Sequence, residues 1–100
     1  MSTSTLHRTG LFRGTGADLE VSGDKVGFRP TRVEVKNLTQ NTSAWWAEDM
    51  ADDSMSKTIT DGTQSLVTAN GITPVGSGFQ LGADTLLNGS EDEIHFECWG

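Results

Sequence analysis

Two histidines and one cysteine are the side chains that could carry acid–base or nucleophilic catalysis in this chain of 100 residues. From Glu93 to Trp99 apolar and polar residues alternate, which predicts a strand with Cys98 on its buried face and His95 on the opposite face. A hydrolytic triad needs a nucleophile, a histidine and a carboxylate together, and no serine lies in a nucleophile-elbow sequence. We therefore predict that the protein is not an enzyme and that Cys98 is a small core residue.

Acidic side chains form the second group with chemical potential, because carboxylates can bind calcium or act in pairs on glycosidic bonds. They cluster in two runs, but neither run has the spacing of an EF-hand loop and nothing singles out a catalytic pair. Transition-metal sites need histidine or cysteine spacings that the chain lacks. We predict charged, solvated loops with no cofactor and no metal ion. Calcium binding stays an open alternative for the two runs, which are Glu48, Asp49, Asp52 and Asp53, and Asp84, Glu91 and Asp92.

The paired tryptophans Trp45 and Trp46 are the side chains best suited to binding, because tryptophan is enriched at the energetic centres of protein interfaces. Neighbouring residues of a strand point to opposite faces. One ring is therefore expected in the core and the other on an outer surface, and which of the two faces outward stays open. Trp99 alternates away from Phe96 and Cys98, so it is expected to help cover a neighbouring molecule.

The elements that position these residues are predicted to be short strands, because alternating apolar and polar residues recur between turn signals. Asp61-Gly62 predicts the turn of a hairpin, and Asn70-Gly71 predicts a second turn. No segment offers three helical turns of apolar periodicity. The pattern predicts an all-β fold, a compact antiparallel β-sandwich, with a jelly roll as one arrangement. The strands are expected within residues 17–22, 31–38, 43–50, 57–60, 64–69, 79–81 and 93–99.

Residues 1–16 are predicted to form an extended N-terminal arm, because they are mostly polar and lie at a chain end. Within them, residues 11–13 could form a very short strand. Residues 17–100 would then form the single β-sandwich domain. Contacts with a partner are expected from the arm and from the tryptophans, namely Leu6, His7, Arg8, Leu11, Phe12, Trp45, Trp46 and Trp99.

The net charge of −7 at pH 7 argues against nucleic acid as a partner, since an acidic surface repels phosphate backbones. Residues 1–36 hold six basic and four acidic residues, a net of +2, whereas residues 37–100 hold one basic and ten acidic residues, a net of −9. A basic arm of one subunit could therefore meet the acidic face of another. No apolar run reaches the roughly 18 residues that a membrane span needs, so no membrane contact is expected. The apolar fraction of 34% predicts a thin core that a partner helps to complete.

Residues 27–100 resemble small structural proteins that tailed-phage and prophage genomes encode. The resemblance lies in GFRPTRVEVKN at residues 27–37, in Trp45-Trp46 followed by Met50, in residues 54–59, and in the closing run from residue 71 to residue 100. It implies a β-rich virion protein that decorates and stabilises the capsid, is made in the bacterial cytoplasm and lies on the capsid surface. Its partners would be the major capsid protein and further copies of itself, with a trimer as one arrangement. The resemblance assigns no function to single residues.

A carbohydrate-binding or receptor-binding module of a phage tail or head appendage is the alternative, because an exposed tryptophan beside carboxylates can stack on a sugar ring. Trp45, Trp46, Glu48 and Asp49 have that composition. The direction of the tryptophan rings separates the two hypotheses. A partner protein would cover the rings in the first, and an open acidic groove would hold them in the second. Location on capsid or tail, copy number and symmetry stay open.

Overall fold

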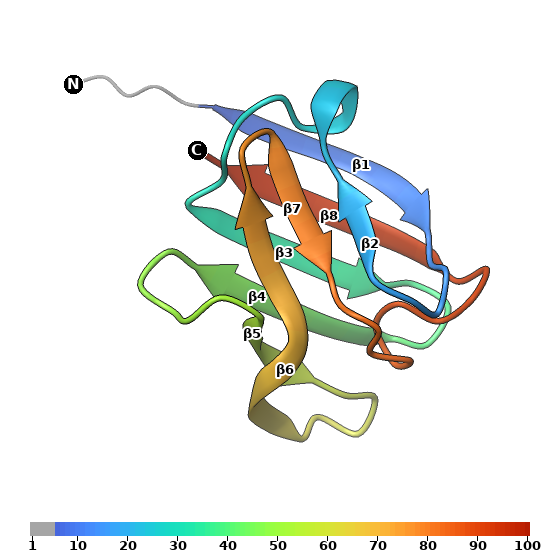
Figure 1. Cartoon of the computed structure of the whole chain (residues 1–100). Coiled ribbons are helices and arrows are strands. Elements are labelled where there is room, and N and C mark those ends of the chain that lie inside the picture. The colour runs from blue at the N-terminus through green and yellow to red at the C-terminus, as the bar shows by residue number, and fades with distance from the viewer. Residues whose placement is uncertain (1–5) are drawn as a thin grey trace.

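The computed structural model describes residues 6–100, which form one antiparallel sheet of eight strands (Figure 1). A short 3-10 helix, η1 (Gly23–Lys25), follows the second strand, and the described residues contain no α-helix. The predicted all-β antiparallel class is therefore confirmed. Over the same residues, no helix has the length and apolar character to cross a membrane. The strands are β1 (His7–Arg13), β2 (Leu19–Val21), β3 (Arg32–Asn37), β4 (Thr42–Ala47), β5 (Ser54–Thr58), β6 (Gln64–Val75), β7 (Gly78–Leu81) and β8 (Glu93–Trp99).

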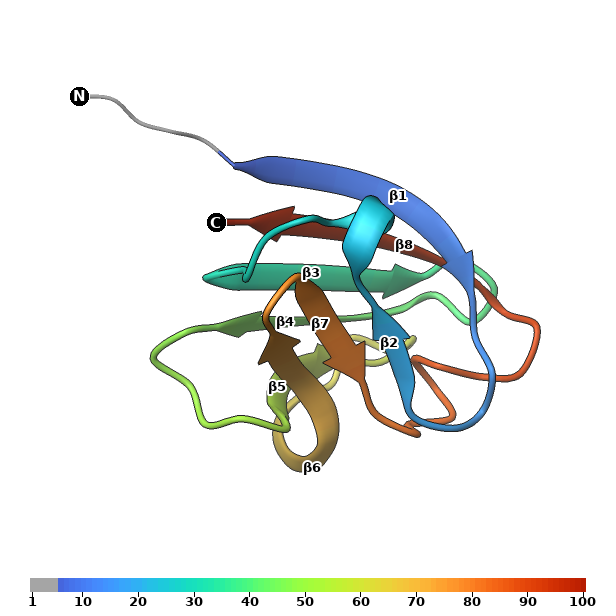
Figure 2. The same cartoon turned by 45° about the horizontal axis from the view of Figure 1, so that its top comes forward.

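The sheet is continuous and curls over on itself, as the two views in Figures 1 and 2 show. Its hydrogen-bonded order is β1-β8-β3-β4-β5-β6-β7-β2. The corner lies in β6, because the first part of this strand pairs with β5 and its second part pairs with β7. Asn70, with φ at 57°, bends β6 between the two parts. The predicted turn at Asn70-Gly71 is therefore wrong, and the chain instead reverses between Val75 and Gly78.

The hydrophobic core lies between the two ends of the curled sheet. Phe79 of β7 packs against Phe12 of β1 and Phe96 of β8, with ring centroids 6.4 Å and 5.7 Å away. These contacts bring the β6-β7-β2 end over the β1-β8-β3 end and close the core. The alternation predicted for two strands is confirmed, since the buried side chains are Val33 and Val35 in β3 and Ile94, Phe96 and Cys98 in β8.

Cys98 is fully buried, so its thiol is expected to react slowly with thiol reagents while the protein is folded. Burial, assisted by the negative charge of Glu97, raises the pKa of the Cys98 thiol from 9.0 to about 12. The fold favours the neutral thiol, so this stabilisation is present below pH 9.0 and is lost as the pH rises towards 12. We expect iodoacetamide at pH 8 to label the native protein at least about a thousandfold more slowly than the urea-unfolded protein, measured by mass spectrometry. Equal labelling rates would contradict the buried position.

The first described strand corrects the predicted arm. His7–Arg13 pairs with β8 over its whole length, from His7 opposite Trp99 to Arg13 opposite Glu93. Phe12 is buried, and Gly10 leaves room for the ring of Phe96, which a Cβ at that position would approach to 2.8 Å. The polar composition concealed this strand, because its other side chains face solvent at the edge of the sheet. Of the predicted arm, residues 1–5 lie outside the described residues.

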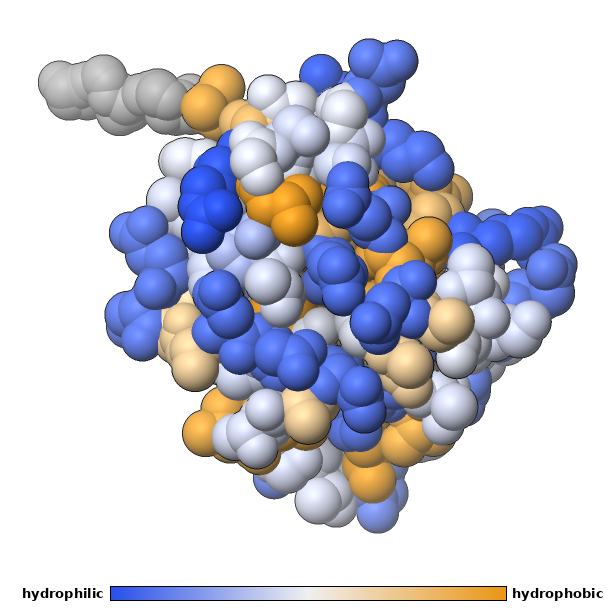
Figure 3. Space-filling view, viewed as in Figure 1, coloured by the Kyte–Doolittle hydropathy of each residue, from blue (hydrophilic) through white to orange (hydrophobic). Residues whose placement is uncertain are grey.

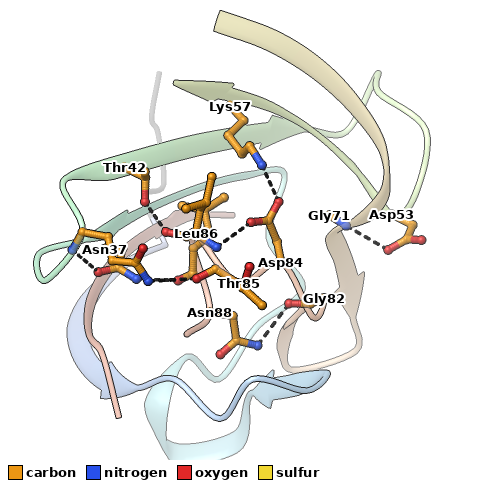
Figure 4. Close-up of polar contacts among 12 residues, drawn as sticks. Asn37, Thr42, Asp53, Lys57, Gly71, Gly82, Asp84, Thr85, Leu86 and Asn88 are labelled. Carbon is orange, nitrogen blue, oxygen red and sulfur yellow. Dashed lines mark hydrogen bonds and ion pairs between the residues drawn. The ribbon is translucent and has the colours of Figure 1, made fainter. Parts of the chain in front are cut away.

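Polar side chains hold the connection from β7 to β8 against the sheet (Figure 4). Lys57 of β5 donates from Nζ to Oδ2 of Asp84 at 2.6 Å, and both side chains are largely buried. The hydroxyl of Thr42 donates to the carbonyl of Leu86, and Asn88 donates to the carbonyl of Gly82 at 3.0 Å. These bonds fix a long connection that has no regular secondary structure, and they close one end of the core.

Candidate functional site

The side chains that point away from the core on neighbouring strands form one continuous surface, which we call the outer face. Alternation within each strand selects them, and strand register aligns them in rows. One row joins Glu97 of β8, Glu34 of β3, Trp45 of β4 and Ser56 of β5. The outer face consists of His7, Thr9, Leu11 and Arg13 (β1), Glu93, His95, Glu97 and Trp99 (β8), Arg32, Glu34 and Lys36 (β3), Ser43, Trp45 and Ala47 (β4), Ser56 and Thr58 (β5), and Gln64 and Leu66 (β6).

Arg32 lies between two tryptophans on the outer face, at the end of the sheet where β3 begins and β8 ends. Its guanidinium carbon lies 4.7 Å from the ring centroid of Trp45 and 5.8 Å from that of Trp99. Arg32 also donates from Nη2 to Oε2 of Glu34 at 2.8 Å. Cation–π contact and ion pairing both restrict the arginine side chain, so less entropy is lost when a partner covers it. The result is a preorganised group of two aromatic rings and one cation.

His7 of β1 extends this group to the edge of the sheet. Its ring centroid lies 5.4 Å from that of Trp99, and its Nε2 lies 2.7 Å from Oε2 of Glu97. Glu97 and Glu34 face each other across β8 and β3. Glu97 forms a hydrogen bond with the ring of His7, and Glu34 forms an ion pair with Arg32. The two carboxylates therefore each have a partner, which limits their mutual repulsion.

A groove of about 280 Å³ lies beside Trp45 on the outer face. Strand register places Arg32 on one side of Trp45 and the groove residues Lys36 and Ser43 on the other side. The groove offers one aromatic ring together with carboxylates, hydroxyls and an imidazole. Its lining consists of Glu34, Val35, Lys36, Ser43, Ala44, Trp45, Ser56, Thr58, His95 and Glu97.

Four of the eight predicted contact residues come together on the outer face, namely His7, Leu11, Trp45 and Trp99. Leu11, Trp45 and Leu66 are also three of the exposed large apolar residues of the described chain. Of the large exposed side chains, Leu6 precedes β1 and accepts a backbone hydrogen bond from Gly100 at 2.9 Å. The eight contact residues were predicted from their types, and the structure places four of them on one surface.

Of the other predicted contacts, Phe12 and Trp46 are corrected by their burial, whereas the exposed Leu6 and Arg8 stay predictions. Phe12 and Trp46 are buried in the core, and Trp46 donates from Nε1 to the carbonyl of Ala51 at 3.0 Å. Arg8 donates from Nη1 to the carbonyl of Asp24 at 3.1 Å. The sugar-binding set around the tryptophan pair is also corrected, because Trp46 points away from the surface that exposes Trp45.

Arg32 is the central residue that reasoning from the sequence missed. Alternation with Val33 and Val35 places it on a solvent-facing row, but the register that sets it opposite Trp99 joins residues far apart in the chain. The residues next to Arg32 in the sequence contain no signal that predicts its pairing with Trp99. A cation on an outward strand position near an exposed tryptophan is the only hint that the sequence holds.

The opposite side of the molecule differs from the outer face. Figure 3 shows the side on which β2, β6 and β7 lie in front, where apolar side chains are interspersed with hydrophilic ones. Single exposed apolar residues of this kind are ordinary on a soluble surface. Among residues 6–100, both arginine–tryptophan contacts lie on the outer face instead.

The outer face offers stacking, ion pairing and hydrogen bonding to a binding partner. His95 shares the groove with Ser43 and Glu97, but none of the hydrogen bonds between described residues joins it to a hydroxyl or a carboxylate. In residues 6–100, no group of three His, Cys, Asp or Glu side chains is placed to hold a metal ion. No protein-family model matches this chain, and neither a curated protein nor a solved structure matches it.

Proposed function

We propose that the protein is a virion structural protein of a tailed phage, which decorates and stabilises the capsid by binding the lattice of the major capsid protein through its outer face. The observation that carries the proposal is Arg32 held between Trp45 and Trp99. Arginine and tryptophan dominate the binding energy of protein interfaces, above all where they form a central cluster. The resemblance of residues 27–100 to phage structural proteins supplies the identity of the partner.

The surroundings of this cluster suit a protein partner. Leu66 lies in the same row as Trp45, and Leu11 lies opposite the groove residue His95, so both give a partner apolar area to bury on the same surface. Charges of both signs lie around the tryptophans, as in the polar rim of a protein interface. On a symmetric shell the same contact repeats around each axis, and a trimer of this protein at a three-fold axis is one arrangement that such repetition produces.

The test compares binding to capsid shells that were assembled without this protein. We expect Arg32→Ala and Trp45→Ala each to weaken binding about 30-fold, because loss of a central anchor costs about 2 kcal/mol. Leu38→Ala is the matched control, since Leu38 is 48% exposed but lies in the turn after β3, outside the outer face. Sedimentation of shells with labelled protein measures the affinities. Identical affinities for Arg32→Ala, Trp45→Ala and Leu38→Ala would refute docking through this surface.

A glycan-binding module is the second candidate, and the groove beside Trp45 favours it. The free side of the indole ring faces a groove that Glu34, Glu97 and several hydroxyl groups line. Such a set can stack on a sugar ring and accept hydrogen bonds from its hydroxyls. A glycan array separates the candidates. Retention of a glycan that Trp45→Ala abolishes, together with no binding of the wild type to shells, would replace the capsid proposal by this one.

A further inference from the structure

The edge of the sheet at β1 has a row of backbone groups without partners in the described chain. β1 is the last strand at one end of the sheet order, and only β8 pairs with it. Gly100 donates to the carbonyl of Leu6, and Gly14 donates to that of Asp92, which sets the hydrogen-bonding alternation of this strand pair. In an antiparallel ladder every second residue of a strand bonds to the same neighbour, so residues 8, 10 and 12 bond to β8 as Leu6 and Gly14 do. The backbone groups facing the open edge therefore belong to His7, Thr9, Leu11 and Arg13.

This edge is long enough to act as a template for another strand. β1 has seven residues and no proline. Figure 2 shows no further strand beyond it, and the hydrogen bonds among residues 6–100 include none to the outward backbone groups of these four residues. A row of unpaired donors and acceptors of this kind accepts an added strand through main-chain hydrogen bonds.

The charge of the edge indicates which strand fits. β1 carries His7, Arg8 and Arg13 and no acidic residue, in a chain with a net charge of −7. Pairing two copies of β1 would bring together two strands that each carry two arginines and no acidic residue, and like charges across a strand pair are destabilising. The edge therefore disfavours its own copy and favours an acidic strand.

We propose that the open edge of β1 binds an extended acidic segment of the capsid lattice by strand addition. This inference rests on the proposed function and names the kind of segment that the protein recognises. Because side chains of paired strands align on one face, the segment would carry carboxylates opposite His7 and Arg13 and an apolar residue opposite Leu11. His7 and Leu11 belong to the outer face as well, so the edge and the outer face form one continuous docking surface.

The experiment removes one outward donor and leaves the pairing with β8 intact. The N–H of Thr9 faces the open edge, so Thr9→Pro deletes it without losing a bond to β8, and proline is tolerated on edge strands. Thr9→Val keeps the N–H and serves as the control. We expect Thr9→Pro to bind empty capsid shells about tenfold more weakly than Thr9→Val, since a hydrogen bond and close strand approach are lost. Circular dichroism verifies the fold of both variants.

Arg13→Gln is a second variant that tests the proposal without the proline substitution. It keeps the backbone intact and removes one cation, so binding to shells is expected to weaken and to depend less steeply on salt. Equal binding by Thr9→Pro and Thr9→Val, or by Arg13→Gln and the wild type, would overturn strand addition while leaving outer-face docking in place. A dimer in solution that Thr9→Pro dissolves would overturn it in favour of a second copy. Failure of the wild type to bind shells would instead remove the proposed function.

Discussion

Trp46→Ala is expected to lower the free energy of unfolding by about 3–5 kcal/mol, because removing a fully buried aromatic ring leaves a cavity that the surroundings fill only partly. The side chain is 2% exposed, and its Nε1 donates to the carbonyl of Ala51. The substitution also removes one of the two hydrogen bonds that this carbonyl accepts, while the one from the Ser54 hydroxyl at 2.6 Å remains. Urea unfolding followed by far-ultraviolet circular dichroism measures the loss, since this signal does not depend on tryptophan fluorescence.

Trp45→Ala is the matched control, one residue away on the same strand. Trp45 is 39% exposed and faces the outer face, so its removal is expected to cost less than about 1 kcal/mol of stability. Its effect should appear in partner binding instead. If the two variants were equally destabilised, or if Trp45→Ala were the less stable, the assignment of the rings to opposite faces would be wrong.

Lys57→Met is expected to destabilise the protein by about 3 kcal/mol, near the lower end of the range for a broken buried ion pair. Lys57 and Asp84 are 15% and 10% exposed, so the substitution leaves a carboxylate that water reaches poorly. Asp84 also accepts a hydrogen bond from the backbone of Leu86, which fixes the connection between β7 and β8. The thermal midpoint of unfolding and its denaturant midpoint both measure the change.

The double variant Lys57→Met/Asp84→Asn tests whether the stranded charge is the cause. The amide at residue 84 still accepts the Leu86 N–H but carries no charge, so the double variant is expected to be more stable than Lys57→Met alone. Additive losses from the two substitutions would show instead that the uncompensated charge of Asp84 is not the cause of the destabilisation.

Local patterns predicted the strands with one buried face. Val33 and Val35 alternate with charged residues, and Ile94, Phe96 and Cys98 alternate in β8, so their burial followed from the period of two. The hairpin at Asp61-Gly62 was predicted for the same reason, since its turn signal and both strands lie within a few residues.

Features set by distant parts of the chain could not be predicted in this way. β1 is a strand because β8, at the other end of the chain, pairs with it, and its own residues are mostly polar. The group around Arg32 depends on a register between β3 and β8 that no local signal encodes. The bend at Asn70 replaced a predicted turn because β6 continues from one partner strand to the next.

The proposals for the outer face and for the β1 edge describe one docking surface with two kinds of contact. The Arg32 cluster supplies anchoring side chains, and the edge supplies a row of backbone groups with basic side chains around it. Anchors fix the affinity, whereas main-chain pairing and complementary charge fix the orientation. A subunit that must sit in one orientation on a repeating lattice needs both.

An image reconstruction of capsid shells saturated with the protein tests the central claim most directly. The account predicts that Trp45, Arg32 and Trp99 lie against the major capsid protein, and that density for a capsid strand continues the sheet beyond β1. Shells that bind the protein with this surface turned to solvent, or that stay bare at saturating protein concentration, would contradict it.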